Sequence, residues 1–525
     1  MTSTLDLFPA PPGGDRLGDL LARTADRLPE KVALVGGDES VTWSSFDHRV
    51  DRLATAFLEL GIRRGDRLGI VSTVRPEYLL TYLAAARIGA ILVGFNPLYT
   101  PAELRQLAEL TRPALVVVAP GDSAAAAIEL FAAFAGVRHV LTCGGLAGGH
   151  GGLEDALAAA VPGDDLARRR TEVAADDGVL IVFTSGSTGL PKAALLTHRN
   201  VIANVRAEVR ELGVTADDRM LLHLPLSHVG GATEIVIPAL LTGATLVLLE
   251  SFHPLTTLRL VERQRITFLG QVPTMYVLEL GLPEFSTFDL SSLRLVAVAG
   301  AATPEAVMRR LATMAPRVVT GYGLTEVAGF VTYTQAGDDV ETLASTVGRP
   351  VPEFALRLVD DEHRKVAAGE VGEVAIRGSC VMREYFGDPA ATAATVDAGG
   401  WLYTGDLGHL DARGYLVLGE RKKEIFITGG YNVSPREVEE HLARHPAVGL
   451  AACIGRPHPV LGEVGAAYVV PRNGFEPSQD ELLEHCRAGL AEYKVPRVLE
   501  IRAALPLTPL GKVDKVQLRR EVAPG

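Results

Sequence analysis

Length and composition set the first limits on this chain. It has 525 residues, 47% hydrophobic and 22% charged, and its 51 basic and 63 acidic side chains give a formal net charge of −12. A chain this long exceeds one ordinary hydrophobic core, so two or more domains are expected. The composition is that of a globular protein and excludes a disordered one. The acidic balance disfavours a nucleic-acid-binding protein, although it leaves room for a local basic site that binds a small anion.

The cysteines and the most apolar window exclude further classes. The four cysteines form no C-x-x-C pair, so zinc sites and thioredoxin-like chemistry have no support, and scattered free thiols fit a reducing cytoplasm. The N-terminal residues show no secretory signal pattern. The most apolar window, residues 78–95, is interrupted by Arg87, Gly89 and Gly94, which indicates a buried helix leading into a strand rather than a membrane span.

The N-terminal part alternates between two patterns. Apolar residues at helical spacing predict helices over 17–28, 44–60 and 75–88, and short apolar runs predict strands over 31–35, 41–43, 67–71, 91–93 and 114–118. Residues 36–38 predict a hairpin turn, and Ser44 and Ser45 are candidate caps for the second helix. Strands that alternate with helices predict βαβ units and mainly parallel sheets. Residues 123–177 predict a helix, a strand over 137–141 and a loose surface segment.

A strand followed by a loop of small residues is the centre of the sequence. Residues 179–183 are apolar and mostly β-branched or aromatic, and Thr-Ser-Gly-Ser-Thr-Gly-Leu-Pro-Lys follows at 184–192. Glycine lets a backbone approach a ligand closely, successive amide N–H groups can converge on an anion, and Lys192 adds a mobile positive charge. The loop therefore predicts a phosphate site, and a solvent-exposed Gly/Ser turn is the alternative. Its spacing fits neither the Walker loop nor the nucleophile elbow.

A second series of strands and helices follows. Strands are predicted over 219–225, 245–249, 266–269, 295–302 and 318–320, and helices over 258–264 and from residue 271. Ligands of α/β sheets bind beyond the carboxyl ends of the strands. Two clusters of small residues fall at such ends, Gly300-Ala301-Ala302 and Gly321-Tyr322-Gly323.

The pattern changes from residue 348 to short β segments with turns, such as 355–359, 372–377 and 415–418. A charged stretch at 419–423 is interpreted as an interdomain hinge, and the hundred or so residues after it suffice for one small domain, with helices predicted over 438–443 and 479–490. The expected fold class is therefore α/β. A large N-terminal domain of βαβ layers with mainly parallel sheets and a small β subdomain (1–419) precedes a small mobile α+β C-terminal domain (420–525), with the hinge at 421–423.

Two further motifs could bind a nucleotide. In the sequence Gly-Tyr-Gly-Leu-Thr-Glu at 321–326, the tyrosine ring between glycines can lie flat against a purine, Thr325 can bond a phosphate, and Glu326 can bind Mg²⁺ as a hard oxygen ligand. Asp406, in a Thr-Gly-Asp sequence, could accept both hydroxyl protons of a ribose. Taken alone, the first motif is also typical of a tight turn with a buried tyrosine, and the second of an ordinary β turn.

These motifs, in this order, resemble the adenylate-forming superfamily of acyl-CoA synthetases, firefly luciferase and peptide-synthetase adenylation domains. The 184–192 loop is similar to the signature loop of the family, and Pro-Leu-Thr-Pro-Leu-Gly-Lys at 506–512 resembles its final motif. The resemblance covers nearly the whole chain, from about Leu17 to Arg519. The chain departs from the family at Ala193, where glycine usually follows the loop lysine, and at Gly419-Glu420-Arg421, where Asp-Arg is common.

The resemblance implies a role for each matching position. The residues expected to bind ATP or AMP are Thr184, Ser185, Gly186, Ser187, Thr188, Gly189, Lys192, Gly300, Ala301, Ala302, Gly321, Tyr322, Gly323, Thr325, Asp406 and Arg421. The expected catalytic residues are Lys512, Glu326, His228 and Thr184, with Glu326 and Thr184 as Mg²⁺ ligands. The expected acyl pocket comprises His228, Val229, Gly230 and Gly323, the CoA tunnel Gly429, Gly430 and Tyr431, and the hinge Lys423.

The activity that the resemblance implies is that of an AMP-forming acyl-CoA synthetase, an acid–thiol ligase. A carboxylic acid and ATP with Mg²⁺ would give an acyl-adenylate and pyrophosphate, the small domain would rotate, and the CoA thiol would displace AMP. Lys512 would stabilise the negative charge that builds at the α-phosphate. Three alternatives stay open: an adenylation enzyme that loads a carrier protein, a specialised member that only forms the thioester from a supplied acyl-adenylate, and a non-catalytic nucleotide-binding protein.

The acid is expected to be apolar, either fatty-acid-like or bulky, because Gly230 and Gly231 would leave an open pocket. The other expected partners are ATP and CoA, with no nucleic acid and no integral membrane segment. A homodimeric assembly is left open, and the expected location is the cytoplasm.

Overall fold

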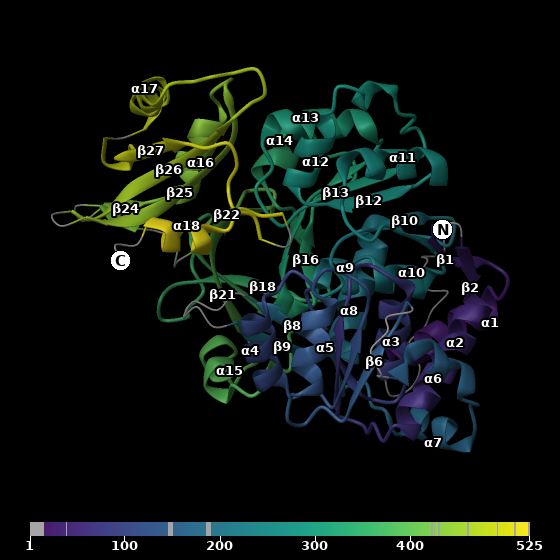
Figure 1. Ribbon diagram of the computed structural model, residues 1–525. Helices are drawn as coiled ribbons and strands as arrows, with labels where there is room; N and C mark the ends of the chain where they lie inside the picture. The colour runs from purple at the N-terminus through teal and green to yellow at the C-terminus, as the bar shows by residue number, and fades with distance from the viewer. Residues whose placement is uncertain are drawn as a thin grey trace.

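The computed structural model describes residues 15–37, 39–144, 151–184, 191–421, 424, 426–428, 431–458, 461–490, 492–508 and 511–522. Figure 1 shows a large body that holds the N-terminal helices and the sheets labelled up to β22, and a smaller lobe, yellow-green to yellow, that begins near β24 and contains the C-terminus. This arrangement confirms the predicted α/β fold with a large N-terminal and a small C-terminal domain.

Two mainly parallel sheets form the large body. The first contains, in spatial order, β20 (Glu384–Tyr385), β9 (Lys192–Thr197), β8 (Gly178–Thr184), β4 (Ile91–Phe95), β3 (Arg67–Val71), β5 (Leu115–Val118), β6 (His139–Thr142) and β7 (Gly151–Gly152). The second contains β14 (Val318–Val319), β13 (Leu295–Val298), β12 (Phe268–Gln271), β10 (Arg219–Leu222), β11 (Thr245–Leu248), β1 (Val32–Gly36) and β2 (Glu39–Thr42). Only pairings at an edge are antiparallel: β8–β9–β20 in the first sheet and β1–β2 in the second. The strands are short and almost continuously apolar, as parallel strands covered on both faces should be.

Three antiparallel or mixed sheets complete the fold. A small sheet of β15 (Gly321–Leu324), β16 (Gly329–Tyr333) and β17 (Arg349–Pro350) precedes one of β18 (Ala355–Val359), β19 (Gly372–Arg377), β21 (Leu402–Leu410) and β22 (Leu416–Arg421). The C-terminal domain is built on β24 (Tyr431–Val433), β23 (Phe426–Thr428), β26 (Gly462–Pro471) and β25 (Val448–His458), with β27 (Val498–Ile501) parallel to β26.

Helices cover the sheets on both sides (Figure 1). Those of the large body are α1 (Leu17–Arg27), α2 (Trp43–Glu59), α3 (Pro76–Arg87), α4 (Pro101–Thr111), α5 (Ala124–Ala132), α6 (Leu153–Ala159), α7 (Asp164–Glu172), α8 (His198–Leu212), α9 (Val229–Ala232), α10 (Val236–Thr242), α11 (Pro254–Gln264), α12 (Pro273–Leu280), α13 (Glu305–Met314), α14 (Val340–Ser345) and α15 (Pro389–Thr395). The C-terminal domain has α16 (Pro435–Ala443), α17 (Gln479–Gly489) and α18 (Lys515–Val522). Within the described ranges, no helix is both long and apolar enough to span a membrane.

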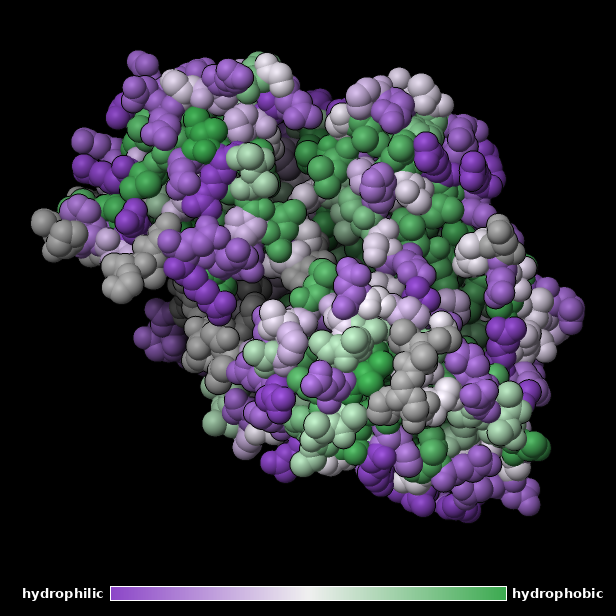
Figure 2. Space-filling model, viewed as in Figure 1, coloured by the Kyte–Doolittle hydropathy of each residue, from purple (hydrophilic) through white to green (hydrophobic). Residues whose placement is uncertain are grey.

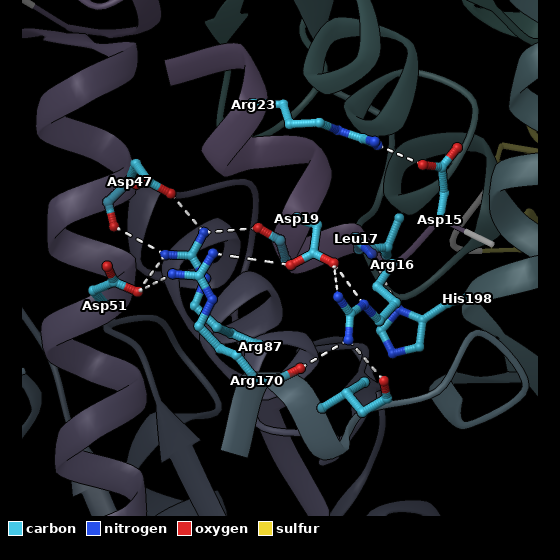
Figure 3. Close-up of polar contacts among 12 residues, drawn as sticks. Asp15, Arg16, Leu17, Asp19, Arg23, Asp47, Asp51, Arg87, Arg170 and His198 are labelled. Carbon is cyan, nitrogen blue, oxygen red and sulfur yellow. Dashed lines mark hydrogen bonds and ion pairs between the residues drawn. The ribbon is translucent and has the colours of Figure 1, made fainter. Parts of the chain in front are cut away.

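A buried arginine joins the first three helices (Figure 3). The Arg87 side chain, at the end of α3, is fully buried and forms ion pairs of 2.5 Å with Asp47 and 2.6 Å with Asp51, both on α2. It also donates to the backbone carbonyl of Gly18 on α1 at 2.9 Å. Arg87 is therefore a structural residue, since a buried charge must be compensated by partners of this kind.

Three local expectations were wrong. The cap of α2 is Thr42, whose hydroxyl accepts from the Ser45 amide at 3.2 Å, so neither Ser44 nor Ser45 caps the helix. The segment expected to be a loose surface contains α6 and α7. Helix α7 begins with acidic residues and ends with basic ones, an order that favours a helix through its dipole. Residues 321–324 form strand β15 and not a loop, because β16 pairs with them.

Candidate active site

The metal and phosphate candidates meet around a tyrosine that the sequence did not single out. The Tyr385 hydroxyl donates to Oε1 of Glu326 at 2.7 Å, and Lys192 Nζ lies 4.4 Å from the centroid of the Tyr385 ring. Tyr385 reaches both because β20 pairs with β9, the strand that begins at Lys192. Its hydrogen bond holds Glu326 in one orientation, and its ring attracts the lysine ammonium.

The strand that precedes the predicted phosphate loop and the strand that follows it are neighbours. Thr184 at the end of β8 is paired with Lys192 at the start of β9, so both ends of the loop lie together. Ala193 points into the hydrophobic core and is 1% exposed, so its methyl group packs there. The departure from the family at this position therefore changes the core of the sheet and not the phosphate-facing side.

The candidate for the purine, Tyr322, is in direct contact with the candidate for the ribose, Asp406. The Tyr322 hydroxyl donates to Oδ2 of Asp406 at 2.6 Å, and both side chains are buried. Gly405, at φ +75° within β21, precedes Asp406, and its amide donates to Oε1 of Glu373 at 2.8 Å. Asp406 is also the backbone partner of Arg421 in the β21–β22 pair. Asp406 thus connects Tyr322, on β15 of one small sheet, with Arg421, its partner on β22 of the other.

Lys512 reaches from the C-terminal domain into the large body. It lies in a tight turn in which its carbonyl accepts from the Thr508 amide at 2.6 Å, and its amide donates to Thr508 Oγ1 at 3.2 Å. A Cβ atom built on Gly300 would be 3.1 Å from Lys512 Cε and 3.3 Å from Nζ. The predicted catalytic lysine therefore lies against the predicted adenine-lining segment, where Gly300 at φ +91° leaves room for it. Figure 2 shows the surface hollowed between the C-terminal lobe and the large body.

His228 caps the short helix α9 beside this lysine. Its Nδ1 accepts from the Gly230 amide at 3.1 Å, so the neutral ring carries its proton on Nε2 and can donate there. Burial, with a smaller contribution from the charge of Lys512, lowers the pKa of His228 to about 3. A neutral imidazole with one free donor can bind a carboxylate without taking part in proton transfer.

The glycines of the expected acyl pocket differ in their surroundings. A Cβ on Gly230 would make only ordinary contacts, with Leu224, His228 and Glu234, so a methyl group would fit there without a clash. A Cβ on Gly231 would be 2.6 Å from two backbone carbonyl oxygens, which shows that Gly231 is packed and opens no pocket. The expectation for Gly231 was wrong. Gly323 is packed in the same way, with a Cβ position overlapping the Gly329 carbonyl.

The structure places some of the other candidates only in part. Ala301 and Ala302 are exposed after β13, while Thr325 is buried after β15 and Val229 is buried in α9. The predictions for Ser185, Gly186, Ser187, Thr188, Gly189, Lys423, Gly429 and Gly430 lie outside the described residues. For Arg421 and Tyr431 only their places at the end of β22 and the start of β24 are described.

The site fits a magnesium ion bound together with nucleotide phosphates. Mg²⁺ usually takes one or two carboxylates and completes its shell with water and phosphate oxygens, and Glu326 offers a carboxylate already oriented by Tyr385. In the described part of the chain no group of three or more His, Cys, Asp or Glu side chains could form a cage for a metal. A shared Glu326–phosphate site is therefore the arrangement that these residues can provide.

Comparison with known proteins agrees with this geometry. The AMP-binding enzyme family matches residues 21–386, and the AMP-binding enzyme C-terminal domain matches residues 437–512. The chain is 37% identical over 506 residues to the 3-[(3aS,4S,7aS)-7a-methyl-1,5-dioxo-octahydro-1H-inden-4-yl]propanoyl:CoA ligase of Mycobacterium tuberculosis, covering 95% of this chain and 97% of that one. It is 36% identical over 511 residues to a feruloyl-CoA synthase of an Amycolatopsis species, covering 96% and 98%. The solved structure of the anthranilate CoA ligase AuaEII with anthranoyl-AMP aligns with a TM-score of 0.88 at 27% identity, over 97% of each chain.

The chain belongs to the AMP-binding enzyme family, within the adenylate-forming superfamily. In that superfamily it is an AMP-forming acyl-CoA ligase, an acid–thiol ligase whose substrates are a carboxylic acid, ATP and CoA, and which uses Mg²⁺ with ATP.

Proposed function

We propose that this acyl-CoA ligase activates a bulky, ring-bearing carboxylic acid and that the residues predicted from the sequence carry the roles assigned to them. Support for the acid comes from the relatives, whose names contain ring-bearing acyl groups, and from Gly230, where the missing side chain leaves room for at least a methyl group. Support for the roles comes from the convergence of Lys512, His228 and Gly300, since these belong to three distant segments of the chain.

In the first half-reaction, the acid's carboxylate oxygen attacks the α-phosphorus of ATP, and the bond to pyrophosphate breaks. His228 holds the carboxylate by donating from Nε2, and Lys512 stabilises the negative charge that develops on the α-phosphate oxygens. Tyr322 and Asp406 hold the adenosine, and the 184–192 loop holds the phosphates. Glu326 and Thr184 would hold Mg²⁺ together with the phosphates, and the ion would supply positive charge that offsets the charge of the leaving pyrophosphate.

In the second half-reaction, the CoA thiolate attacks the acyl carbon and AMP leaves. The contact of the Lys512 side chain with Gly300 supports the proposal that the present arrangement is that of the first half-reaction. We propose that the C-terminal domain, residues 420–525, rotates about the hinge at 421–423, removes Lys512 and brings the Gly430 loop to the site. The cytoplasmic location, supported by four buried cysteines that are all free thiols, and the homodimer remain predictions.

The contact between Lys512 and Gly300 carries this proposal, and substitution of the lysine tests it. Lys512→Ala is expected to lower acid-dependent ATP–pyrophosphate exchange by at least about 100-fold, because a transition-state charge loses its counter-ion. Thioester formation from synthetic acyl-AMP and CoA should persist within a few-fold of the unmodified enzyme. Lys365→Ala, at an exposed lysine of the small β subdomain, is the control. Loss of both half-reactions, or of neither, would contradict the assigned role.

A further inference from the structure

A group of buried polar side chains lies behind the proposed acid site. Asn204 and Glu208 are four residues apart on α8 and therefore share one face of that helix, which packs against β16, where Tyr333 is the last residue. Glu234 joins them from the link between α9 and α10. The exposed fractions of Asn204, Glu208 and Tyr333 are 0%, 2% and 1%.

Three polar atoms of this group are buried without a hydrogen-bond partner. Asn204 donates both amide protons, to the carbonyls of Val327 at 3.0 Å and Phe330 at 2.8 Å. These two bonds fix the orientation of the side-chain amide, with Oδ1 pointing away from the two carbonyls. That oxygen has no partner, and neither do Oε2 of Glu208 and the hydroxyl of Tyr333. A buried polar atom without a partner costs about 1–3 kcal/mol, so three in one place mark a position where a ligand could supply what is missing.

The two carboxyl groups are kept neutral by their surroundings. Burial raises the pKa of Glu234 to about 8, against an opposing effect of the Lys512 charge. Burial first, and the neighbouring Glu234 second, raise the pKa of Glu208 well above its usual range. Protonated carboxyl groups can both accept and donate, so the cluster does not demand a charged ligand.

Two glycines connect this cluster with the acid site. The Cβ position of Gly230 lies 3.5 Å from His228 Nδ1 and 3.6 Å from Glu234 Oε2, so the two side chains flank a residue that has none. The Cβ position of Gly329 lies 2.7 Å from Asn204 Oδ1 and 3.1 Å from Glu234 Oε1. Any larger residue at 329 would displace these two oxygens, and one at 230 would fill the space between His228 and Glu234.

We propose that the acid of this ligase carries a hydroxyl or amino group on its body, away from the carboxylate, and that this group donates a hydrogen bond to the cluster of Asn204, Glu208 and Glu234. The carboxylate lies at His228 and the donor at Glu234, with the acid passing over Gly230. This inference rests on the proposed function and deepens it. It replaces the expected purely apolar acid by one with a polar end, because buried acceptors without partners penalise an apolar group.

Matched acids test the proposal on the full-length enzyme with ATP, Mg²⁺ and CoA. The panel consists of cinnamic and 3-phenylpropanoic acids with one substituent at the ortho, meta or para position of the ring, together with the unsubstituted parents. The substituent is a hydroxyl or amino group, which can donate, a methyl group, or an acetyl group, which can only accept. Methyl and hydroxyl are close in size, so their comparison isolates the hydrogen bond. For at least one ring position, kcat/KM for thioester formation should be about 10-fold or more higher with hydroxyl or amino than with methyl, since a site built to bond a donor rejects the analogue that lacks it.

Two variants locate the effect. Glu234→Leu should reduce the hydroxyl-to-methyl ratio to about 1 or reverse it, while Glu234→Gln, whose amide both donates and accepts, should keep part of it. Glu279→Gln is the matched control, because burial likewise raises the pKa of Glu279 to about 8. Glu279 accepts from Gln271 elsewhere in the large body, so its substitution should leave the ratio unchanged. A second readout needs no turnover: infrared difference spectra should show a protonated-carboxyl stretch that shifts when the preferred acid binds and is absent in Glu234→Gln.

The outcomes separate this inference from the proposed function. Three outcomes would overturn the inference and leave the proposed ligase activity standing. They are equal rates with methyl and hydroxyl acids, a preference for the acetyl acids, and a hydroxyl-to-methyl ratio that is unchanged in both Glu234 variants. The unchanged ratio would mean that the carboxyl groups form hydrogen bonds only with each other and not with the acid. Failure of every acid to support pyrophosphate exchange would instead contradict the proposed ring-bearing acid, and the inference would fall with it. If Glu234→Leu does not fold, the ratio in Glu234→Gln and its infrared spectrum decide.

Discussion

Tyr385 shows how one side chain can serve two functional residues at once. Its hydroxyl orients the Glu326 carboxylate, and its ring lies under the ammonium of Lys192. Neither contact touches substrate, so Tyr385 is a positioning residue. Substitution of a group that orients a metal ligand typically lowers metal affinity or activity by about 10- to 100-fold.

Substitution of Tyr385 separates its two contacts. Tyr385→Phe removes the hydrogen bond to Glu326 and keeps the ring beside Lys192, so we expect pyrophosphate exchange to need about 10-fold more Mg²⁺ for half-maximal rate, with a smaller change in the KM for the acid. Tyr385→Leu removes both contacts and should also raise the KM for ATP.

Tyr415→Phe provides the matched control for this prediction, because it removes a 2.7 Å hydroxyl–carboxylate bond to Asp338 outside the site. An Mg²⁺ dependence that is the same in Tyr385→Phe and Tyr415→Phe would show that Tyr385 has only a structural role.

The sequence singled out the candidate site residues more readily than the residues that contact and support them. Lys192, Glu326 and Lys512 stand in motifs with fixed spacing, which can be recognised from the sequence alone. Tyr385 follows no motif, and its role arises only because β20 pairs with β9, a contact between residues almost 200 positions apart. Glu234 was missed for a similar reason, since a lone carboxyl beside an apolar run gives no sign of burial.

At the scale of elements, the ends of helices were the hardest feature to predict. The start of α2 depended on whether Thr42 or Ser44 capped it, and these residues have nearly equal preference for that position. Most buried strands of the two parallel sheets were predicted within a few residues, because parallel strands covered on both faces appear as continuous apolar runs. The buried strand β9 was missed, because it begins at the lysine that ends the loop motif. Contacts between helix ends, such as that of His198 with α1, follow from tertiary structure alone.

His198 makes the junction between α8 and α1 sensitive to acid. It is the first residue of α8, is fully buried, and accepts from the Leu17 amide at 3.2 Å (Figure 3). Burial is the main cause that lowers its pKa to about 4, with a smaller effect of Arg16 in the same direction, opposed by Asp177. The unfolded chain, with a pKa near 6.5, therefore binds the proton first, so this contribution to stability is complete above about pH 6.5 and is lost as the pH falls towards 4.

The change in unfolding free energy over this window should be about 3 kcal/mol. We expect His198→Gln to unfold at a lower temperature than the unmodified protein at neutral pH and to lose less stability between about pH 7 and about pH 4.5. Part of the slope should remain, because burial also lowers the pKa of His223 to about 4. His48→Gln, at an exposed histidine of α2, is the control, and an equal slope in all three proteins would contradict the assignment to His198.

At the scale of the whole molecule, the candidate site is assembled from two domains. The N-terminal domain contributes the candidates Glu326, His228 and the predicted nucleotide residues, and the C-terminal domain contributes the candidate Lys512 through a single short turn. Interfaces between the domains of one chain resemble transient protein–protein interfaces, so relative motion of the two domains is the default expectation. We therefore expect the contact of Lys512 with Gly300 to link the position of the C-terminal domain to the first half-reaction.

Gly300 offers a test of this coupling that leaves Lys512 itself unchanged. Gly300 and Gly337 both have φ +91°, so alanine is equally strained at either position, but a Cβ on Gly300 would meet Lys512 Cε at 3.1 Å whereas nothing lies within 4 Å of one on Gly337. Both substitutions should cost about 1–2 kcal/mol of stability. Only Gly300→Ala should slow pyrophosphate exchange, by roughly 10- to 100-fold, because a small displacement of a catalytic group is costly. Thioester formation from synthetic acyl-AMP should remain near normal in both variants, since that step is proposed to proceed with Lys512 withdrawn. Equal losses of exchange in the two variants would mean that backbone strain, and not the contact with Lys512, controls the first half-reaction.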